Sequence, residues 1–186
     1  MNFCVLGAGE KPLNESTKHL FRGINYKRGD QVLNVDSRPL PGIDRVQNLQ
    51  ILPQKDSYDP GICWENLGDR MFDVVIAEHI AEHIWDRIAF LVECRRILKP
   101  GGMLILEVPS WKHAAGHNML EHKSTWGRSA FDSNNYVSQS LGFFSERVEF
   151  RVAFEWIIVG YVQGFVGRML DRLGFATAYR YYLRTK

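Results

Sequence analysis

The stretch that decides the fold is residues 72–84, which read Phe72-Asp73-Val74-Val75-Ile76-Ala77-Glu78-His79-Ile80-Ala81-Glu82-His83-Ile84. Its first half is a short apolar run, as expected for a strand that is buried on both faces of a parallel sheet. Two Glu-His pairs, four residues apart, follow at once. Because charged side chains are rarely buried without a partner, we expect this cluster at the carboxyl end of the strand, where open α/β sheets bind their ligands.

Strand-like and helix-like segments alternate on both sides of this stretch. Apolar strand patterns occur at residues 3–6, 31–36, 45–49, 103–108, 143–154 and 177–183. Helical periodicity over residues 84–98 ends at Lys99-Pro100-Gly101-Gly102, and residues 156–173 predict a long apolar helix. This alternation predicts an α/β fold with a mostly parallel sheet, as a single domain over residues 1–186.

Composition limits the classes of protein to consider. The chain of 186 residues is 45% hydrophobic with a formal net charge of +2, which is ordinary for a globular protein and gives no reason to expect nucleic-acid binding. Its three cysteines share no ligand spacing and suit buried thiols in a reducing compartment. We find no secretory signal and no apolar run long enough to span a bilayer, so we expect a cytoplasmic protein.

The first two predicted strands end in residues that suit a nucleoside. Gly7-Ala8-Gly9 follows the first strand as a tight turn, and Asp36 ends the second. Glycine lets a ligand approach the backbone closely, and a carboxylate in this position can accept hydrogen bonds from ribose hydroxyls. The G-x-G-x-x-G fingerprint is incomplete because Pro12 stands where the third glycine would be. A nicotinamide-dependent oxidoreductase is therefore the weaker interpretation.

Several blocks in order resemble the signature of class I S-adenosylmethionine-dependent methyltransferases, from about residue 3 to residue 109. They are Leu6-Gly7-Ala8-Gly9-Glu10, Asn34-Val35-Asp36, Leu49 with Leu52-Pro53, Phe72-Asp73-Val74-Val75 with Glu82-His83-Ile84, and Arg95-Arg96-Ile97-Leu98-Lys99-Pro100-Gly101-Gly102-Met103-Leu104. The resemblance implies a Rossmann-like fold with a mostly parallel sheet of about seven strands, the last one antiparallel, and helices on both faces. It also implies a cofactor-binding half at residues 1–109 and a substrate-side half at residues 110–186.

The resemblance also implies a cofactor, S-adenosylmethionine, and places it on particular residues. Gly7, Ala8 and Gly9 would lie beneath its methionine part, together with Glu78 and His79. Asp36, with Ser37 beside it, would bind the ribose hydroxyls, Asn48 would lie near the adenine, and Leu49 would pack on the adenine face. Two positions depart from the family pattern: Lys11 replaces a common glycine and Asn48 a common aspartate. They keep open a second hypothesis, a non-catalytic binding or assembly module.

The function implied is methyl transfer to a small-molecule or glycan-type acceptor. The aromatic content of residues 110–175 would suit such an acceptor and would equally suit a plain core, and this segment carries no identifying motif. Proximity and alignment provide much of the rate of an attack on an activated methyl group. A base is needed only where the attacking atom carries a proton at working pH, and the candidates are His83, His79 and His117.

Two further features admit other interpretations. His79-Ile80-Ala81-Glu82-His83 matches the H-x-x-E-H motif of some zinc proteases, but it directly follows a buried strand and is explained by the flanking blocks. His113, His117 and His122 fit no standard metal spacing, so we predict no metal ligands. The apolar helix expected at residues 156–173 could support a homodimer or a weak contact with a membrane surface.

Overall fold

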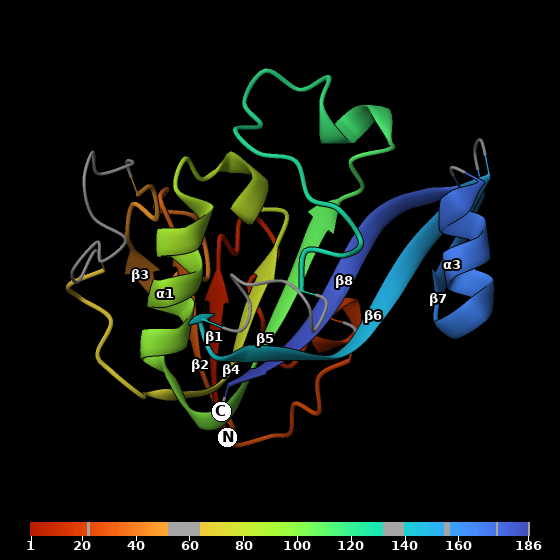
Figure 1. Cartoon of the computed structure of the whole chain (residues 1–186). Coiled ribbons are helices and arrows are strands. Elements are labelled where there is room, and N and C mark those ends of the chain that lie inside the picture. The colour runs from red at the N-terminus through yellow and green to blue at the C-terminus, as the bar shows by residue number, and fades with distance from the viewer. Residues whose placement is uncertain (22, 52–63, 132–139, 155–156, 174, 186) are drawn as a thin grey trace.

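The computed structural model describes residues 1–21, 23–51, 64–131, 140–154, 157–173 and 175–185. In these residues eight strands form one sheet in the order β3-β2-β1-β4-β5-β8-β6-β7 (Figure 1). The parallel strands are β1 (Asn2–Leu6), β2 (Gln31–Asp36), β3 (Arg45–Val46), β4 (Phe72–Glu78) and β5 (Leu98–Pro109). The α/β, mostly parallel fold predicted from the sequence is confirmed.

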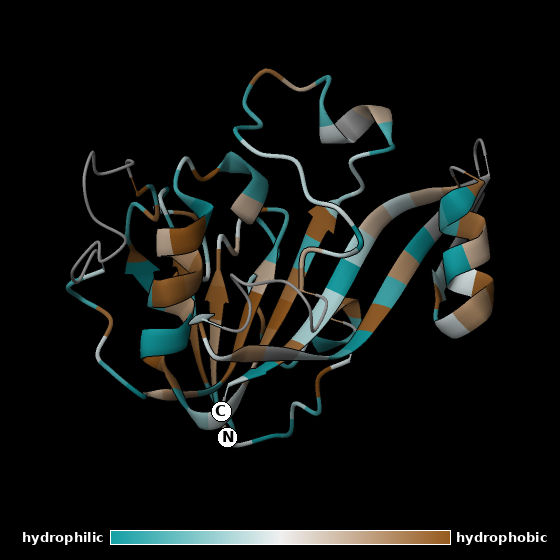
Figure 2. Ribbon diagram, viewed as in Figure 1, coloured by the Kyte–Doolittle hydropathy of each residue, from teal (hydrophilic) through white to brown (hydrophobic). Residues whose placement is uncertain are grey.

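The remaining three strands run antiparallel to their neighbours. β8 (Ala176–Thr185) pairs with β5 and with β6 (Phe143–Phe154), and β7 (Ile157–Val162) adds to the outer edge of β6. The described sheet therefore has one strand more than the seven expected. The central strands are apolar along their length, whereas β6 and β8 alternate in hydropathy (Figure 2). Burial on both faces accounts for the apolar central strands, and β8 is also buried along most of its length.

One face of the sheet is covered by α1 (Arg87–Ile97). The Asp86 side chain caps the helix by accepting a hydrogen bond from the backbone N–H of Ala89 at 2.9 Å. Phe90 and Cys94 of the helix are buried in the larger core cluster, together with side chains from β1, β4 and β5. The capping group and the apolar face together fix α1 against the central strands.

The opposite face of the sheet differs from the expectation of helices on both faces. Among the described residues it carries no α-helix, only the short 3-10 helix η1 (Lys18–Leu20) within the connection from β1 to β2. Leu13 and Phe21 of that connection are buried against Phe3 and Val5 of β1. Irregular chain can cover this face because Asn34 satisfies part of its backbone, accepting from the N–H of Leu13 at 2.8 Å.

The prediction of one long helix over residues 156–173 is wrong for its first part. The chain forms β7 there and then turns at Gly164 (φ +64°) into α3 (Gly164–Arg172). A short apolar run does not distinguish a buried helix from a strand, and the free edge of β6 decides in favour of the strand. No helix in the described part of the chain is long and apolar enough to cross a membrane.

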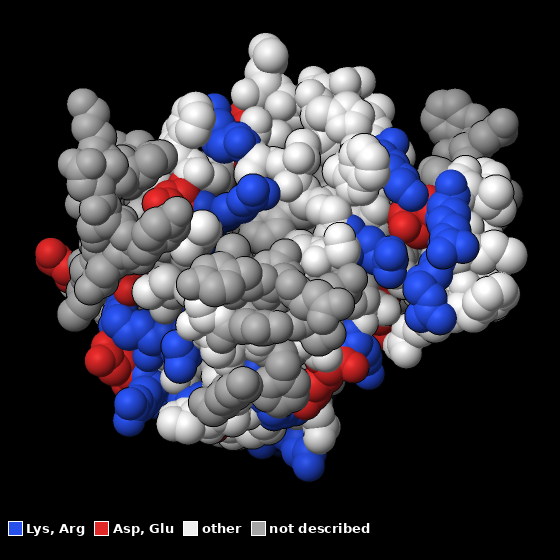
Figure 3. Space-filling model, in the orientation of Figure 1, with Lys and Arg blue, Asp and Glu red and all other residues white. Residues whose placement is uncertain are grey.

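α3 presents apolar side chains to solvent. Phe165, Val166, Met169 and Leu173 are exposed, and the helix also exposes Arg168 and Arg172. On the face in Figure 3, basic side chains lie beside uncharged ones at the position of α3. The dimer or membrane-surface contact expected of this region stays a prediction.

Candidate functional site

The turn after β1 lies at the carboxyl edge of the sheet, where the strand order reverses between β1 and β4. Gly7 and Gly9 both have positive φ, +68° and +56°. Between them the N–H of Ala8 donates to the carbonyl of Val35 in β2 at 3.0 Å. The turn is thus held against β2 in a backbone conformation that favours glycine.

Asp36, at the end of β2, holds this turn directly. Its Oδ2 accepts from the N–H of Gly9 at 2.9 Å, and its Oδ1 accepts from the N–H of Arg38 at 2.9 Å and from Arg38 Nε at 3.3 Å. Burial acts to raise the pKa of Asp36, but the hydrogen bonds from Arg38 and Gly9 outweigh it and hold the pKa below its usual value. The carboxylate is therefore anionic at neutral pH and has lone pairs left to accept from a ligand hydroxyl.

Three neighbouring strands bring charged residues into a row at the same edge. The strand registers place Glu78 of β4 opposite Glu107 of β5, and Glu107 opposite Arg180 of β8. Arg180, with 2% of its surface exposed, donates from Nε to Glu107 at 2.5 Å and from Nη2 to Glu78. A buried guanidinium with two carboxylate partners satisfies the requirement that buried charges be paired.

Two more side chains complete this charged row. The hydroxyl of Tyr161 in β7 donates to both oxygens of Glu107, at 2.8 and 2.6 Å. His79 Nε2 lies 3.3 Å from Glu107 Oε1, and His79 Nδ1 lies 3.5 Å from Glu82 Oε1. These two carboxylate contacts raise the pKa of His79 to about 9. His79 is therefore an imidazolium at neutral pH, which argues against its predicted role as a base.

The glycine turn and the charged row line one cavity of about 580 Å³, here called the glycine-turn cavity. Gly7, Ala8, Glu78 and His79, four of the residues expected at the cofactor, lie along it. Its wall also contains Lys11, Phe21, Arg38, Glu107, Arg151, Tyr161 and Arg180. The cavity offers cations and carboxylates on one side and the backbone of a tight turn on the other.

A second cavity of about 500 Å³, here called the histidine cavity, adjoins the first. Both are lined by His79 and Arg151, so they meet at these side chains. The rest of its lining includes Glu82 and His83 of η2 (Ala81–His83) and, from the connection that follows β5, His113, Met119, Glu121 and His122. Figure 1 shows this connection above the carboxyl ends of the central strands.

His79 itself has an unusual backbone. Its φ is +54°, a region that residues other than glycine adopt rarely. Its N–H donates to the carbonyl of Glu107 at 2.9 Å, which helps to hold it there. Backbone strain of this kind concentrates at functional sites, and here it occurs at the junction of the two cavities.

Other predicted site residues lie apart from these cavities. Ser37 and Asn48 are exposed, and Leu49 is buried in the core that includes α1. Asn48 Oδ1 accepts from the N–H of Gln50 at 3.0 Å. The candidate base His117 follows η3 (Ala114–Gly116), is exposed and is not part of either cavity wall.

Sequence reasoning missed Glu107, Arg180 and Tyr161. A signal was present for the first, since Glu107 interrupts the apolar run of residues 104–108, where a charge needs a buried partner. Arg180 likewise stands between aromatic residues of the last strand. Their partnership depends on the register of β5 against β8, which the sequence does not specify.

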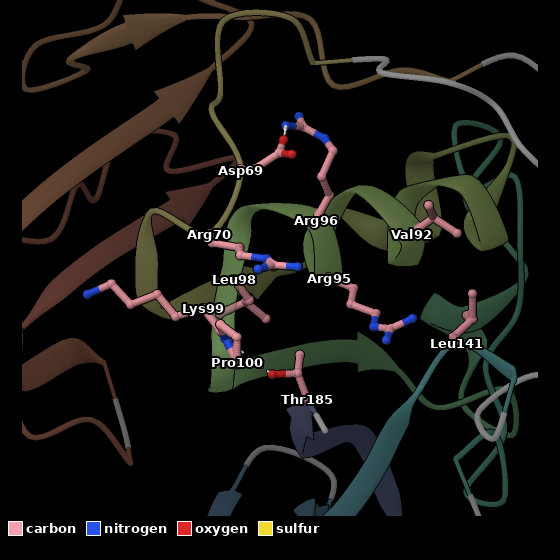
Figure 4. Close-up of a pocket in the computed structure, with 10 residues that line it drawn as sticks. All are labelled: Asp69, Arg70, Val92, Arg95, Arg96, Leu98, Lys99, Pro100, Leu141 and Thr185. Carbon is pink, nitrogen blue, oxygen red and sulfur yellow. Dashed lines mark hydrogen bonds and ion pairs between the residues drawn. The ribbon is translucent and has the colours of Figure 1, made fainter.

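A third cavity, of about 320 Å³, lies at the opposite edge of the sheet (Figure 4). Arg70, Arg95, Arg96 and Lys99 contribute to its wall, and Arg96 is paired with Asp69 at 2.6 Å. It lies where β4 and β5 begin. Because open α/β sheets bind ligands at the carboxyl ends of their strands, it is the weaker candidate for an active site.

Part of the chain is similar in sequence to known methyltransferases. A family model described as a methyltransferase domain matches residues 62–106. A probable S-adenosylmethionine-dependent methyltransferase of Mycolicibacterium smegmatis is 41% identical over 58 residues, which are 31% of this chain and 23% of that protein. The match thus spans less than a quarter of that curated relative.

Solved structures match over nearly the whole chain. A methyltransferase from Archaeoglobus fulgidus described as SAM-dependent aligns with a TM-score of 0.59 at 14% identity, covering 99% of this chain and 86% of that one. A Burkholderia thailandensis 1,6-didemethyltoxoflavin-N1-methyltransferase, with its substrate and S-adenosylhomocysteine bound, aligns with a TM-score of 0.58 at 11% identity, covering 100% and 71%. At these identities the similarity shows the fold.

Proposed function

We propose that the chain is a class I S-adenosylmethionine-dependent methyltransferase and that it transfers a methyl group to a small-molecule or glycan-type acceptor. One observation carries the proposal: the glycine-turn cavity and the histidine cavity meet at His79 and Arg151. Methyl transfer needs two ligands with their reacting atoms in line. Two adjoining cavities at the carboxyl edge of the sheet would suit that arrangement.

The residues of the glycine-turn cavity fit this cofactor. Its volume of about 580 Å³ is in the range of small-ligand sites. The anionic Asp36 is paired with the exposed side chain of Arg38, which lines the cavity, and a rotation of Arg38 would expose the carboxylate to ribose hydroxyls. Glu78, Glu107, Arg151 and Arg180 offer both signs of charge to the amino and carboxylate groups of a methionine moiety. When bound, S-adenosylmethionine would supply an activated methyl group.

The chain's own residues would align the acceptor and exclude water. His79, charged through Glu107 and Glu82, would act as a hydrogen-bond donor at the junction of the cavities. His83 lines the histidine cavity, with its Nδ1 3.3 Å from the carbonyl of Glu121. A carbonyl only accepts, so Nδ1 carries the proton and Nε2 has the free lone pair. Of the predicted bases, His83 is therefore best placed to accept a proton from the acceptor.

The acceptor proposed is small because the histidine cavity measures about 500 Å³. The 1,6-didemethyltoxoflavin-N1-methyltransferase from Burkholderia thailandensis, solved with 1,6-didemethyltoxoflavin bound, supports a small acceptor in the same fold. We also propose a cytoplasmic location. Burial raises the pKa of Cys4 to about 12 and holds that of Cys94 well above its usual value, and such inert thiols suit a reducing compartment.

Isothermal titration with S-adenosylhomocysteine tests the cofactor assignment. We expect stoichiometric binding, weakened at least about tenfold in Asp36→Asn, since each ribose hydrogen bond to a charged acceptor contributes about 1.5–3 kcal/mol. Asp69→Asn is the matched control, because Asp69 is exposed and pairs only with Arg96 at the far edge of the sheet in the described structure. Absence of binding at millimolar ligand would favour the non-catalytic module, and binding of NADH instead would favour an oxidoreductase.

A further inference from the structure

The histidine cavity contains polar atoms that the protein leaves unsatisfied. Within the described residues, neither Glu82 Oε2 nor His122 Nδ1 has a hydrogen-bond partner, although both atoms are buried. Glu82 is only 2% exposed, and its other oxygen faces His79. A buried carboxylate oxygen without a partner is costly, and one explanation of such an atom in a native structure is a bound ion.

Three potential ligands converge at this point. One ligand atom from each of Glu82, His83 and His122 lies within 4.8 Å of the others. The two imidazole rings stand edge to face, with centroids 4.7 Å apart and planes at 80°. Ligand atoms bound to a tetrahedral ion at about 2.0–2.2 Å are about 3.4 Å apart. Small rotations of these side chains would therefore close them around an ion.

The supporting structure around the ligands already has the form of a metal site. His83 Nδ1 faces the carbonyl of Glu121, which fixes the tautomer and leaves Nε2 free to coordinate. A metal-bound histidine usually donates its other N–H in this way. The carbonyl of Glu82 accepts from the N–H groups of Lys123 and Ser124, at 2.7 and 3.2 Å. The main chain thus fastens the segment that carries His122 to η2.

We propose that Glu82, His83 and His122 bind a divalent transition-metal ion, of which zinc is the best matched. Two imidazoles and one carboxylate suit transition-metal ions such as zinc, whereas magnesium and calcium bind oxygen ligands. Three protein ligands leave at least one coordination position open, and it faces the histidine cavity that all three residues line. Under the proposed function, that position would receive an oxygen of the acceptor, and a metal-bound His83 would serve as a ligand in place of its role as a base. The site differs from the H-x-x-E-H interpretation, which would use His79 rather than His122.

Titration of the full chain with zinc chloride tests the site, with bound metal counted by elemental analysis after dialysis. We expect one zinc per chain in the wild type, and affinity at least about tenfold lower in Glu82→Gln and in His122→Ala. His117→Ala is the matched control, because His117 is exposed on the same connection and outside the cavity. It should bind zinc as the wild type does.

Thermal unfolding of the wild type with zinc and with magnesium tests the site without relying on variants, which could fail to fold. Zinc, but not magnesium, should raise the melting temperature of the wild type, since a ligand that binds only the folded state stabilises it. Equal zinc affinity in the wild type and the ligand variants, or loss of binding in His117→Ala, would overturn the proposal. Titration with S-adenosylhomocysteine reports on the proposed function separately, since Glu82, His83 and His122 lie outside the glycine-turn cavity.

Discussion

Replacing Glu107 by glutamine should destabilise the protein strongly, and more at neutral than at acidic pH. The carboxylate is buried and accepts from Arg180 and Tyr161, with His79 at 3.3 Å. Burial acts to raise its pKa, but the hydrogen bond from His79 and the charge of Arg180 outweigh this and lower the pKa to about 2. In Glu107→Gln, the buried Arg180 would lose this charged partner and keep Glu78.

The magnitude follows from the pKa shift. A fall from 4.5 to about 2, at about 1.4 kcal/mol per pKa unit, corresponds to about 3 kcal/mol of folding free energy at pH 7. Loss of one partner of a buried ion pair typically costs about 3–5 kcal/mol. A carboxyl group with a lowered pKa stabilises the fold above its unfolded pKa, and the stabilisation is lost as pH falls toward the folded pKa. The advantage of the wild type should therefore shrink to about 1 kcal/mol at pH 3.

Urea unfolding of the wild type and Glu107→Gln at pH 7 and pH 3, followed by circular dichroism, measures this difference. Glu78→Gln is the matched control: burial is the largest influence on Glu78 and raises its pKa, so its charge does not stabilise the fold. We expect Glu78→Gln to be much less destabilising, and its penalty not to grow as pH rises. Equal destabilisation by the two variants, or a Glu107→Gln penalty independent of pH, would refute the reasoning.

Three other substitutions test local features of the fold. Gly7→Ala should weaken S-adenosylhomocysteine binding several-fold in a titration, because φ at Gly7 is +68° and the added Cβ would lie 3.0 Å from Ile80. Gly29→Ala, also at a positive φ (+95°) but with open space around it, should leave affinity unchanged. Gly167→Ala should lower the stability measured in urea by about 1–3 kcal/mol, because its Cβ would lie 2.5 Å from Phe150 Cδ2 beneath α3. Asp86→Ala should cost about 1 kcal/mol in the same assay through loss of the α1 cap, and restoration by Asp86→Asn would confirm the mechanism.

Local sequence patterns correctly predicted those elements whose secondary structure does not depend on the elements packed beside them. The apolar run of β4, the helix that ends before Lys99 and the glycine turn after β1 were all visible as patterns, because burial on both faces, helical periodicity and positive φ each demand particular residue types. Residues 157–162 show the limit of this approach. Their apolar run suits a helix or a strand equally, and only the free edge of β6 made it a strand.

The two Glu-His pairs after β4 show the same difference between what local sequence predicts and what tertiary contacts decide. The sequence by itself determined that Glu78, His79, Glu82 and His83 stand at the carboxyl end of a buried strand, because charge cannot continue into its apolar interior. Tertiary structure decided what each side chain does. Strand register joined Glu78 to Arg180, and packing of the connection after β5 brought His122 beside Glu82 and His83. Such contacts join residues far apart in the chain, so no local pattern records them.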